Sequence, residues 1–211
     1  FEDATYSPND PPTKLKPGVK LVNYGCRDVS KSNVSRASEI AFGEALAVDP
    51  TTYVGAAVEK SEINAAHDGR IVQCPTTPTP GRVYQRVIDN RMAHDLNLVE
   101  DLRTCTVGGR PVCVFLKRRQ VTKRFLNTNT EVWLRTPEEV FSAAELDQIS
   151  TFTREIGLDW GGVDVLRDRN TGKLCIVDAN QTDMGPPIGL TLPDKVRATY
   201  MLRDAFRKFV R

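Results

Sequence analysis

The hairpin sequence at residues 160–180, WGGVDVLRDRNTGKLCIVDAN, restricts the fold more than any other part of the chain. Two apolar runs flank a polar turn, which predicts two antiparallel strands. A three-residue loop at 170–172 would place Gly172 at the left-handed position that such hairpins favour. Counting back from this loop puts Asp164 about opposite Asp178, although a bulge would move the pairing by one residue.

Both aspartates interrupt apolar runs, and Asn180 follows Asp178 by two residues, so the two side chains project from the same strand face. Neighbouring carboxylates without partners are costly in apolar surroundings, and a hard divalent cation removes that cost. Two carboxylates and an amide oxygen suit Mg²⁺, with phosphate oxygens and water as further ligands. We therefore predict a Mg²⁺ site at Asp164, Asp178 and Asn180. The alternative is that these strands have a solvated face and the acids point into water.

Composition excludes several classes of protein. The 211 residues are 40% apolar and 27% charged, which argues against wholesale disorder and fits one domain or two small subdomains. No run approaches the roughly 20 apolar residues of a membrane helix. The net charge of +2 gives no general attraction to nucleic acid or anionic lipid. Five scattered cysteines without a C-x-x-C pair argue against zinc and for reduced, buried thiols. We expect a cytoplasmic protein without a nucleic-acid or membrane partner, and a homo-oligomer is left open.

The remaining segments predict an α+β chain rich in antiparallel strands. Residues 1–16 contain three prolines among polar residues and are interpreted as a lead-in. A capping box, Ser142-Ala-Ala-Glu145, predicts a helix that Gly157 ends. Helices are also expected at 31–46, from 136 and at 193–209, and strands at 19–23, 55–60, 70–74, 82–88, 100–107, 110–119 and 131–134.

Candidate phosphate-binding groups lie upstream of the hairpin. Lys60 ends an apolar strand, and the polar turn 61–70 that follows can offer backbone N–H groups to phosphate. The P-loop pattern is absent, and an ordinary hairpin with a surface lysine is the alternative. Five cations lie between Lys117 and Arg124. They suit either a polyphosphate clamp or a solvated loop.

Taken in order, these segments resemble the ATP-grasp superfamily of carboxylate–amine ligases. The family pattern is a lysine strand, a phosphate loop, a hinge strand, a D-[IL]-R strand, a basic segment and a final hairpin with G-[VI]-D and [ED]-x-N. The resemblance covers roughly residues 30–190. Its parts here are Lys60, Asn64 to Arg70, Gln85 to Asp89, Asp101 to Arg103, Lys117 to Arg124, Gly162 to Asp164 and Asp178 to Asn180.

The resemblance implies an ATP-grasp fold, with two antiparallel α+β lobes and the nucleotide site between them. The N-terminal subdomain would be 31–95 and the C-terminal subdomain 96–211, after a lead-in or remnant of a further lobe at 1–30. ATP and Mg²⁺ would be the cofactors. The roles implied are catalytic for Arg103, Arg118 and Arg119, nucleotide-binding for Lys60, Asn64, His67, Gly69, Arg70, Gln85, Val87, Ile88 and Asp89, and metal-binding for Asp164, Asp178 and Asn180.

The activity implied is an ADP-forming ligase that joins a small-molecule carboxylate to an amine through an acylphosphate. Two alternatives stay open: a phosphotransferase on the same fold, with His67 or Asp68 as base, and a non-catalytic ATP-binding module. The sequence departs from the family pattern in three places. Asp178 stands where the family usually has Glu, the phosphate loop holds one glycine, Gly69, and residues 1–30 are too few for the usual substrate lobe.

Overall fold

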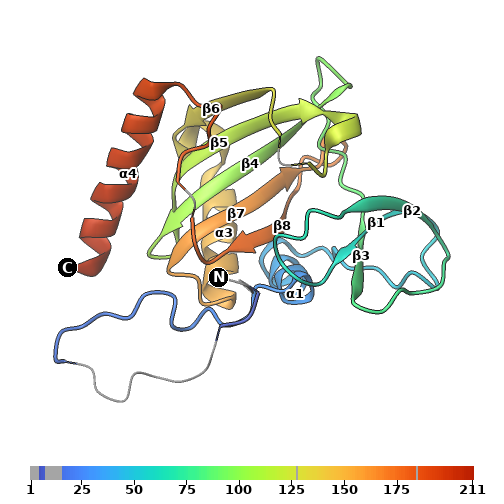
Figure 1. The fold of residues 1–211 in the computed structure, drawn as a ribbon, viewed down its shortest axis with the longest axis horizontal. Coiled ribbons are helices and arrows are strands. Elements are labelled where there is room, and N and C mark those ends of the chain that lie inside the picture. Colours follow the sequence, from blue (N-terminus) through green and yellow to red (C-terminus); the bar gives the residue numbers. More distant parts are fainter. Residues whose placement is uncertain (1–4, 8–15, 127, 184) are drawn as a thin grey trace.

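Two antiparallel sheets form the framework of the protein, and Figure 1 shows them in a computed structural model that describes residues 5–7, 16–126, 128–183 and 185–211. The smaller sheet contains β1 (Gly55–Ser61), β2 (Arg70–Cys74) and β3 (Arg82–Arg86), in the order β2-β1-β3. The larger sheet contains β4 (Leu98–Val107), β5 (Arg110–Gln120), β6 (Glu131–Arg135), β7 (Trp160–Arg167) and β8 (Leu174–Asn180), in the order β6-β5-β4-β7-β8. The predicted α+β class with antiparallel strands is confirmed.

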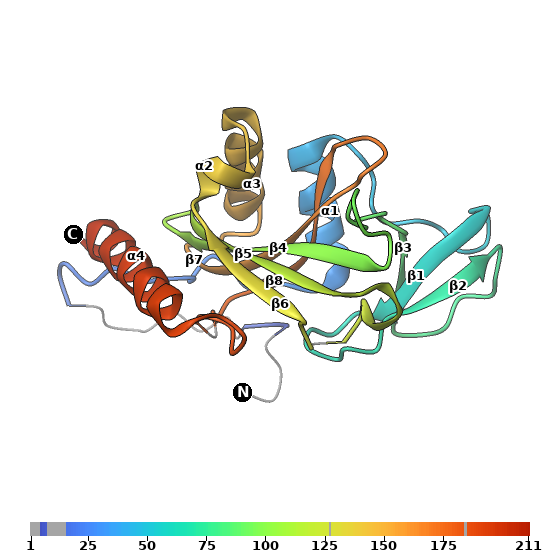
Figure 2. The same cartoon turned by 90° about the horizontal axis from the view of Figure 1, so that it is seen from above.

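The helices are α1 (Lys31–Phe42), α2 (Pro137–Val140), α3 (Ala143–Glu155) and α4 (Leu192–Val210). Figure 2 shows α1, α2 and α3 on one face of the larger sheet and α4 on the opposite face. A 3-10 turn, Val121–Lys123, follows β5. None of the helices in the described part of the chain is long and apolar enough to span a membrane.

Capping residues decide where the helices begin and end. The predicted capping box of α3 is present: Ser142 Oγ accepts from the Glu145 N–H, and the Glu145 carboxylate accepts from the Ser142 N–H. Helix α1 ends at Phe42 rather than at the predicted residue 46. Gly43 adopts a left-handed φ of 76° there and terminates the helix.

The predicted strand at 19–23 is wrong, because the chain bends and turns in this segment. Asn23 takes a left-handed φ of 58°. Its Oδ1 accepts from the N–H groups of Asp159 and Trp160, both at 2.9 Å, and its Nδ2 donates to the Trp160 carbonyl at 2.6 Å. The segment therefore fixes the entry of the chain into β7. Residues 1–4 and 8–15 of the predicted lead-in lie outside the described residues.

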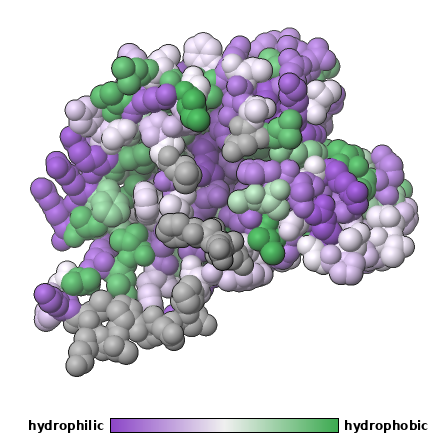
Figure 3. All heavy atoms as spheres, viewed as in Figure 1, coloured by the Kyte–Doolittle hydropathy of each residue, from purple (hydrophilic) through white to green (hydrophobic). Residues whose placement is uncertain are grey.

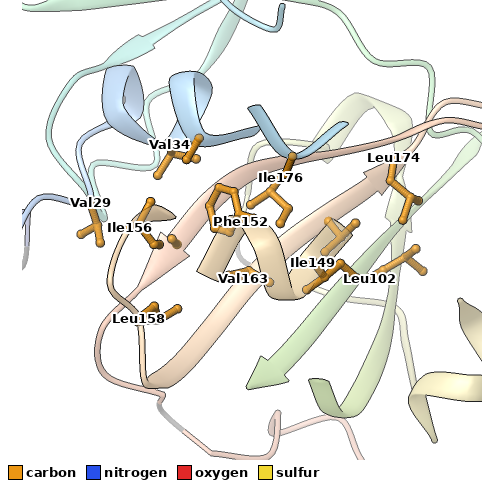
Figure 4. Close-up of a cluster of buried hydrophobic side chains, with 14 of the residues drawn as sticks. Val29, Val34, Leu102, Ile149, Phe152, Ile156, Leu158, Val163, Leu174 and Ile176 are labelled. Carbon is orange, nitrogen blue, oxygen red and sulfur yellow. The ribbon is translucent and has the colours of Figure 1, made fainter. Parts of the chain in front are cut away.

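Two buried clusters attach the helices to the larger sheet. Helices α1 and α3 cover one face, where Val34, Phe152 and Ile176 are fully buried (Figure 4). Helix α4 covers the other face, where Ala198 packs with Phe115. Fully burying an aliphatic or aromatic side chain stabilises the fold by about 1.5–3 kcal/mol, so these clusters carry much of the stability. All five cysteines are buried and free, as predicted.

Gly157 and Gly43 both end a helix with a left-handed φ, but only Gly157 is tightly enclosed. A Cβ on Gly157 would lie 2.5 Å from the carbonyl carbon of Gly25, whereas one on Gly43 would meet nothing within 4 Å. We expect Gly157→Ala to lower the free energy of unfolding by about 3 kcal/mol, and Gly43→Ala by only the ~1 kcal/mol of left-handed strain. Urea unfolding of both variants measures the difference, and equal losses would contradict this packing argument.

Candidate functional site

The hairpin of β7 and β8 makes Asp164 and Asp178 direct partners on neighbouring strands, as the sequence predicted. The route to this pairing differs from the prediction. Asp168 N–H donates to the Lys173 carbonyl at 2.9 Å, so the turn contains four residues, 169–172, rather than three. A longer turn alone would shift the partners by one residue, and a bulge in β8 compensates for it.

The bulge lies at Val177 and also receives a lysine of the smaller sheet. Val165 pairs with Ile176 while Asp164 pairs with Asp178, which leaves Val177 as the extra residue of β8. The carbonyl of Val177 accepts a hydrogen bond from Lys60 Nζ at 2.9 Å. Bulges often reorient a strand beside a functional site. Here the bulge links the lysine of β1 to the acidic hairpin.

Each of the two aspartates is paired with a protein cation. Lys31 Nζ lies 2.5 Å from Asp178 Oδ1, and Arg103 Nη1 lies 3.3 Å from Asp164 Oδ1. Lys31 also donates to Asn64 Oδ1, and its side chain is only 8% exposed. Burial, the largest single influence, would raise the pKa of Asp164, but the charges of Arg103, Lys117 and Arg119 and the hydrogen bond from Arg103 together hold that pKa below its ordinary value. Asp164 therefore stays ionised near neutral pH.

Lys60 is a half-buried lysine whose ammonium is influenced by that of Lys31. Burial, and after it the charge of Lys31, lower the pKa of Lys60 to about 8, although Asp178 acts in the opposite direction. Two neighbouring ammonium groups attract an anion strongly in surroundings of low dielectric constant. The pair of Lys31 and Lys60 is therefore suited to a phosphate group.

A pocket between the two sheets contains both aspartates and both lysines. Figure 3 shows hydrophilic side chains around the junction of the sheets. The pocket measures about 200 Å³, less than the ~300 Å³ from which ligand pockets usually start. Phe125 narrows it by packing on Gly69, where a Cβ would lie 2.8 Å from the Phe125 ring. The polar lining residues are Lys31, Lys60, Ser61, His67, Asp68, Gln85, Arg86, Asn90, Asp101, Lys117, Arg119, Arg124, Asp164 and Asp178.

The loop between β1 and β2 reaches the acidic hairpin through Asn64. Its Nδ2 donates to the Ala179 carbonyl at 3.0 Å and to Asn180 Oδ1 at 3.4 Å. Its N–H donates to Thr5 Oγ1 at 2.8 Å, and Thr5 is completely buried. The predicted phosphate loop and the predicted metal ligands are thus joined directly by side-chain contacts.

Side chains rather than glycines shape the rest of this loop. Ala65 and His67 adopt left-handed φ values of 60° and 49°, which glycine usually supplies. Asp68 accepts from the Ser61 N–H at 3.0 Å and from Arg82, and so ties the two ends of the loop together. Burial would raise the pKa of Asp68, but the Ser61 N–H and Arg82 hold it below its ordinary value. Asp68 is therefore a structural anchor of the loop.

Alternate residues of β5 face opposite sides of the larger sheet. Lys117 and Arg119 line the pocket, and Arg119 Nη2 lies 2.5 Å from Asp101 Oδ2. Arg118 lies on the other face, where its Nε is 2.7 Å from Glu100 Oε2. The structure therefore brings Arg119, but not Arg118, to the pocket.

The segment after β3 forms a further wall of the pocket. Gln85 and Ile88 line it, and Gln85 Nε2 donates to Ser35 Oγ at 2.7 Å. The carbonyl of Ile88 accepts from Arg124 Nη2 at 2.8 Å. The sequence predicted that the backbone of this segment would be free to bind a base. One of its carbonyl groups, that of Ile88, already accepts a hydrogen bond from Arg124.

About half of the predicted site residues line the pocket, and the others do not. Asn64, Asn180 and Arg103 lie behind the lining and contact it or one another. Outside it, Arg70 pairs with Glu59 and Asp89 with Arg91. Val87 and Arg118 are also not among the lining residues. The predicted residues that line the pocket are Lys60, His67, Gly69, Gln85, Ile88, Arg119, Asp164 and Asp178.

The donor set at the hairpin fits a hard divalent cation. Asp164 and Asp178 use Oδ1 for their protein cations, and the hydrogen bonds within the described residues leave Oδ2 of both free. Their side chains are about a quarter exposed, at 23% and 26%. Among the residues that the structure describes, no group of three or more His, Cys, Asp and Glu could hold a metal ion. The amide of Asn180 is the only third ligand that we predict, and phosphate and water oxygens would complete the shell.

The predicted site set lacked several residues that line the pocket, above all Lys31. A cation at the first position of a helix opposes the helix dipole. Lys31 begins α1 at this unfavourable position, and that conflict was one signal. The other was a loose match of Ser30 to Ser32 to a segment where the ATP-grasp family often has a basic residue near the nucleotide. Lys117 could have been inferred from Arg119, because the two residues are two positions apart on one strand and therefore face the same side of the sheet. No local pattern marks Asp101 as the partner of Arg119.

No family model matches the sequence, and no curated protein matches it. Several solved structures match it. The ATP-grasp ligase PsnB, complexed with a phosphomimetic variant of its minimal precursor, Mg and ADP, matches with a TM-score of 0.55 and 14% identity, over 87% of this chain and 59% of that one. PsnB with its minimal precursor gives a TM-score of 0.52 and 14% identity, over 87% and 60%. The VanG D-Ala:D-Ser ligase from Enterococcus faecalis gives 0.54 and 9%, over 89% and 62%.

This chain spans about three fifths of the length of the solved structures that it matches. The matched part covers almost nine tenths of this chain. The resemblance that the sequence motifs indicated is confirmed at the level of the fold. Across most of its length, the chain has the fold of the ATP-grasp ligases.

Proposed function

We propose that the protein is an ATP- and Mg²⁺-dependent ligase that joins a carboxylate to an amine and releases ADP. The observation that carries the proposal is the pocket in which Lys31 and Lys60 face Asp164 and Asp178 between two sheets. Cations on one side suit a polyphosphate, and paired carboxylates suit its metal ion. In this proposal the two sheets belong to the two lobes of a nucleotide clamp, divided near residue 95.

The roles of the residues follow from their positions. Lys31 and Lys60 would bind phosphate oxygens, and Asp164, Asp178 and Asn180 would hold Mg²⁺, which neutralises charge on the transferring phosphate. The segment at Gln85 to Ile88 would bind the adenine. Arg103 and Arg119 would stabilise charge on the acylphosphate that forms when the substrate carboxylate attacks the γ-phosphate and ADP leaves. The amine then displaces phosphate, so the protein mainly positions and neutralises the reactants.

Entry of the nucleotide requires Phe125 and the β1–β2 loop to separate, because their contact at Gly69 narrows the pocket. The phosphotransferase alternative needs a free base near the γ-phosphate. Asp68 is engaged with Arg82 and the Ser61 N–H, which argues against that role. Of the two bases considered, only His67, which is exposed on the loop, stays available. The phosphotransferase alternative therefore depends on His67 alone.

Calorimetry of ATP binding with and without Mg²⁺ tests the proposed site. We expect the wild type to bind ATP only with Mg²⁺, and Asp178→Ala to weaken that binding more than about tenfold, because it removes a metal ligand. Asp147→Ala, which removes an exposed acid of α3, is the matched control and should bind like the wild type. Thermal unfolding of each variant confirms that it is folded.

The reaction itself is tested by measuring ADP release with panels of carboxylates and amines. Release that needs both partners supports the ligase. Release with a hydroxyl compound alone would identify a phosphotransferase. ATP binding without turnover by any pair would support the non-catalytic module, and no nucleotide binding at all would contradict the proposal.

A further inference from the structure

Asp183, three residues after the end of β8, has an incomplete set of partners. Its side chain is only 4% exposed. Its Oδ2 is the one buried side-chain nitrogen or oxygen in the described residues that has no hydrogen-bond partner. An unsatisfied buried polar atom costs about 1–3 kcal/mol, and more when it belongs to a charged group, so its presence requires an explanation.

The carboxylate of Asp183 has two neighbours, the buried thiol of Cys105, which hydrogen-bonds to it, and the guanidinium of Arg103. The guanidinium divides its two ends between two carboxylates. Its Nη1 lies 3.3 Å from Asp164 Oδ1, and its Nη2 lies 3.8 Å from Asp183 Oδ1. Both distances exceed the ~2.7–2.9 Å of a good charge-assisted hydrogen bond. The guanidinium thus lies between two partners and makes an optimal, two-pronged pair with neither of them.

Gly162 leaves the space in which the guanidinium lies. A Cβ there would come within 2.5 Å of Arg103 Nη2 and 2.6 Å of its Cζ. The planar group is therefore pressed against the backbone of β7, and its side chain is only 14% exposed. A short movement along this surface, away from Asp164, would bring it into closer contact with Asp183.

A divalent cation on Asp164 changes the balance between the two partners. Before it binds, Arg103 supplies positive charge to Asp164. Once the cation is bound, that charge is redundant, and the cation and the guanidinium repel each other in a poorly solvated site. Asp183 offers Arg103 a second carboxylate with one oxygen still unpartnered.

We propose that Arg103 moves from Asp164 to Asp183 when a divalent cation binds, and that Asp183 is the positioning residue that receives it. The inference rests on the proposed metal site. It explains why a carboxylate oxygen, Asp183 Oδ2, is buried without a hydrogen-bond partner. It also assigns a function to a residue outside the motifs by which the fold was predicted.

A double-mutant cycle with Mn²⁺ alone as the probe tests this inference, with the free ion followed by electron paramagnetic resonance. We expect Asp183→Asn to weaken Mn²⁺ binding about tenfold, because Arg103 then stays on Asp164. In an Arg103→Gln background, Asp183→Asn should have no further effect. An equal effect in both backgrounds would show that Asp183 acts only by its charge, and no effect in either would show that it does not assist the metal. Both outcomes overturn the inference.

Nuclear magnetic resonance of the Arg103 side chain gives a second readout, which does not need the Arg103 variant to fold. With diamagnetic Mg²⁺, the Nε–Hε signal of Arg103 should shift in the wild type and remain unchanged in Asp183→Asn. A signal that is unchanged in the wild type at saturating Mg²⁺ would overturn the movement. Failure of the wild type to bind either ion would instead contradict the proposed metal site, and the inference with it. The two failures are therefore distinguishable.

Discussion

Gly161→Ala is expected to lower the free energy of unfolding by about 4 kcal/mol or more, among the largest effects of a single substitution. A Cβ on Gly161 would lie 2.2 Å from the carbonyl oxygen of Asn180, and 2.9 Å from a methyl group of Leu158. The first of these is backbone of the neighbouring strand and cannot move alone. The strands β7 and β8 would have to separate next to Asn180. Urea or thermal unfolding measures the loss.

Gly162→Ala is the matched control, because it adds the same methyl group one residue further along the same strand. Its Cβ would meet the far end of a flexible side chain, the guanidinium of Arg103, rather than backbone. We expect a loss within about 1–2 kcal/mol, since the side chain can shift aside. If the two variants lost the same stability, the backbone clash at Gly161 would not be the cause.

The second large effect is expected at Lys60. Replacement by Met should weaken binding of ATP with Mg²⁺ by about 100-fold, because a charge-assisted hydrogen bond to phosphate contributes about 1.5–3 kcal/mol. Lys173→Met is the matched control: its side chain is 58% exposed and pairs with Glu44 away from the pocket. Calorimetry of both variants measures the difference. Equal affinities for the wild type and Lys60→Met would remove Lys60 from the nucleotide site.

The pH dependence of binding gives an independent test of the same lysine. With a pKa of about 8, the Lys60 ammonium is protonated below pH 8 and loses its proton above it. Affinity for ATP with Mg²⁺ should therefore be constant below pH 7 and fall by up to about tenfold per pH unit above pH 8. Lys60→Arg keeps its charge throughout this range and should bind without that fall.

Much of the fold could be predicted from the sequence because its signals are local. Strand β2 has its predicted bounds, and the capping box at Ser142 starts α3 where expected. The errors arose where distant contacts decide the local structure. The apolar run at 19–23 is bent by the hydrogen bonds of Asn23 to the start of β7, a segment more than 130 residues away. No local pattern in the run reports that contact.

The residues of the candidate site divide in the same way, into those that a local pattern predicts and those that distant contacts position. Asp164 and Asp178 could be paired by counting along one hairpin, although the four-residue turn and the bulge at Val177 were two compensating differences. Alternation along β5 indicated that Arg118 and Arg119 face opposite sides, but not which side faces the pocket. The loop after Asn180 was interpreted as part of the substrate pocket, with Asp183 as a residue that could meet the amine. Its pairing with Arg103 could not be predicted, because Arg103 comes from another strand and the intervening path of the chain sets their distance.

Both hairpin aspartates are already paired with protein cations. An ion that enters the pocket would therefore have to carry more charge than these cations in order to compete with them. Lys31 and Arg103 each bring one positive charge to within 2.5 Å and 3.3 Å of a carboxylate oxygen. A sodium or potassium ion offers these carboxylates no more charge than they already have, and it must lose its water shell to do so. Only an ion of higher charge gains enough to displace or share with the resident cations. At the proposed metal site, the side chains of the protein would thereby discriminate between ions by valence before size or geometry has any effect.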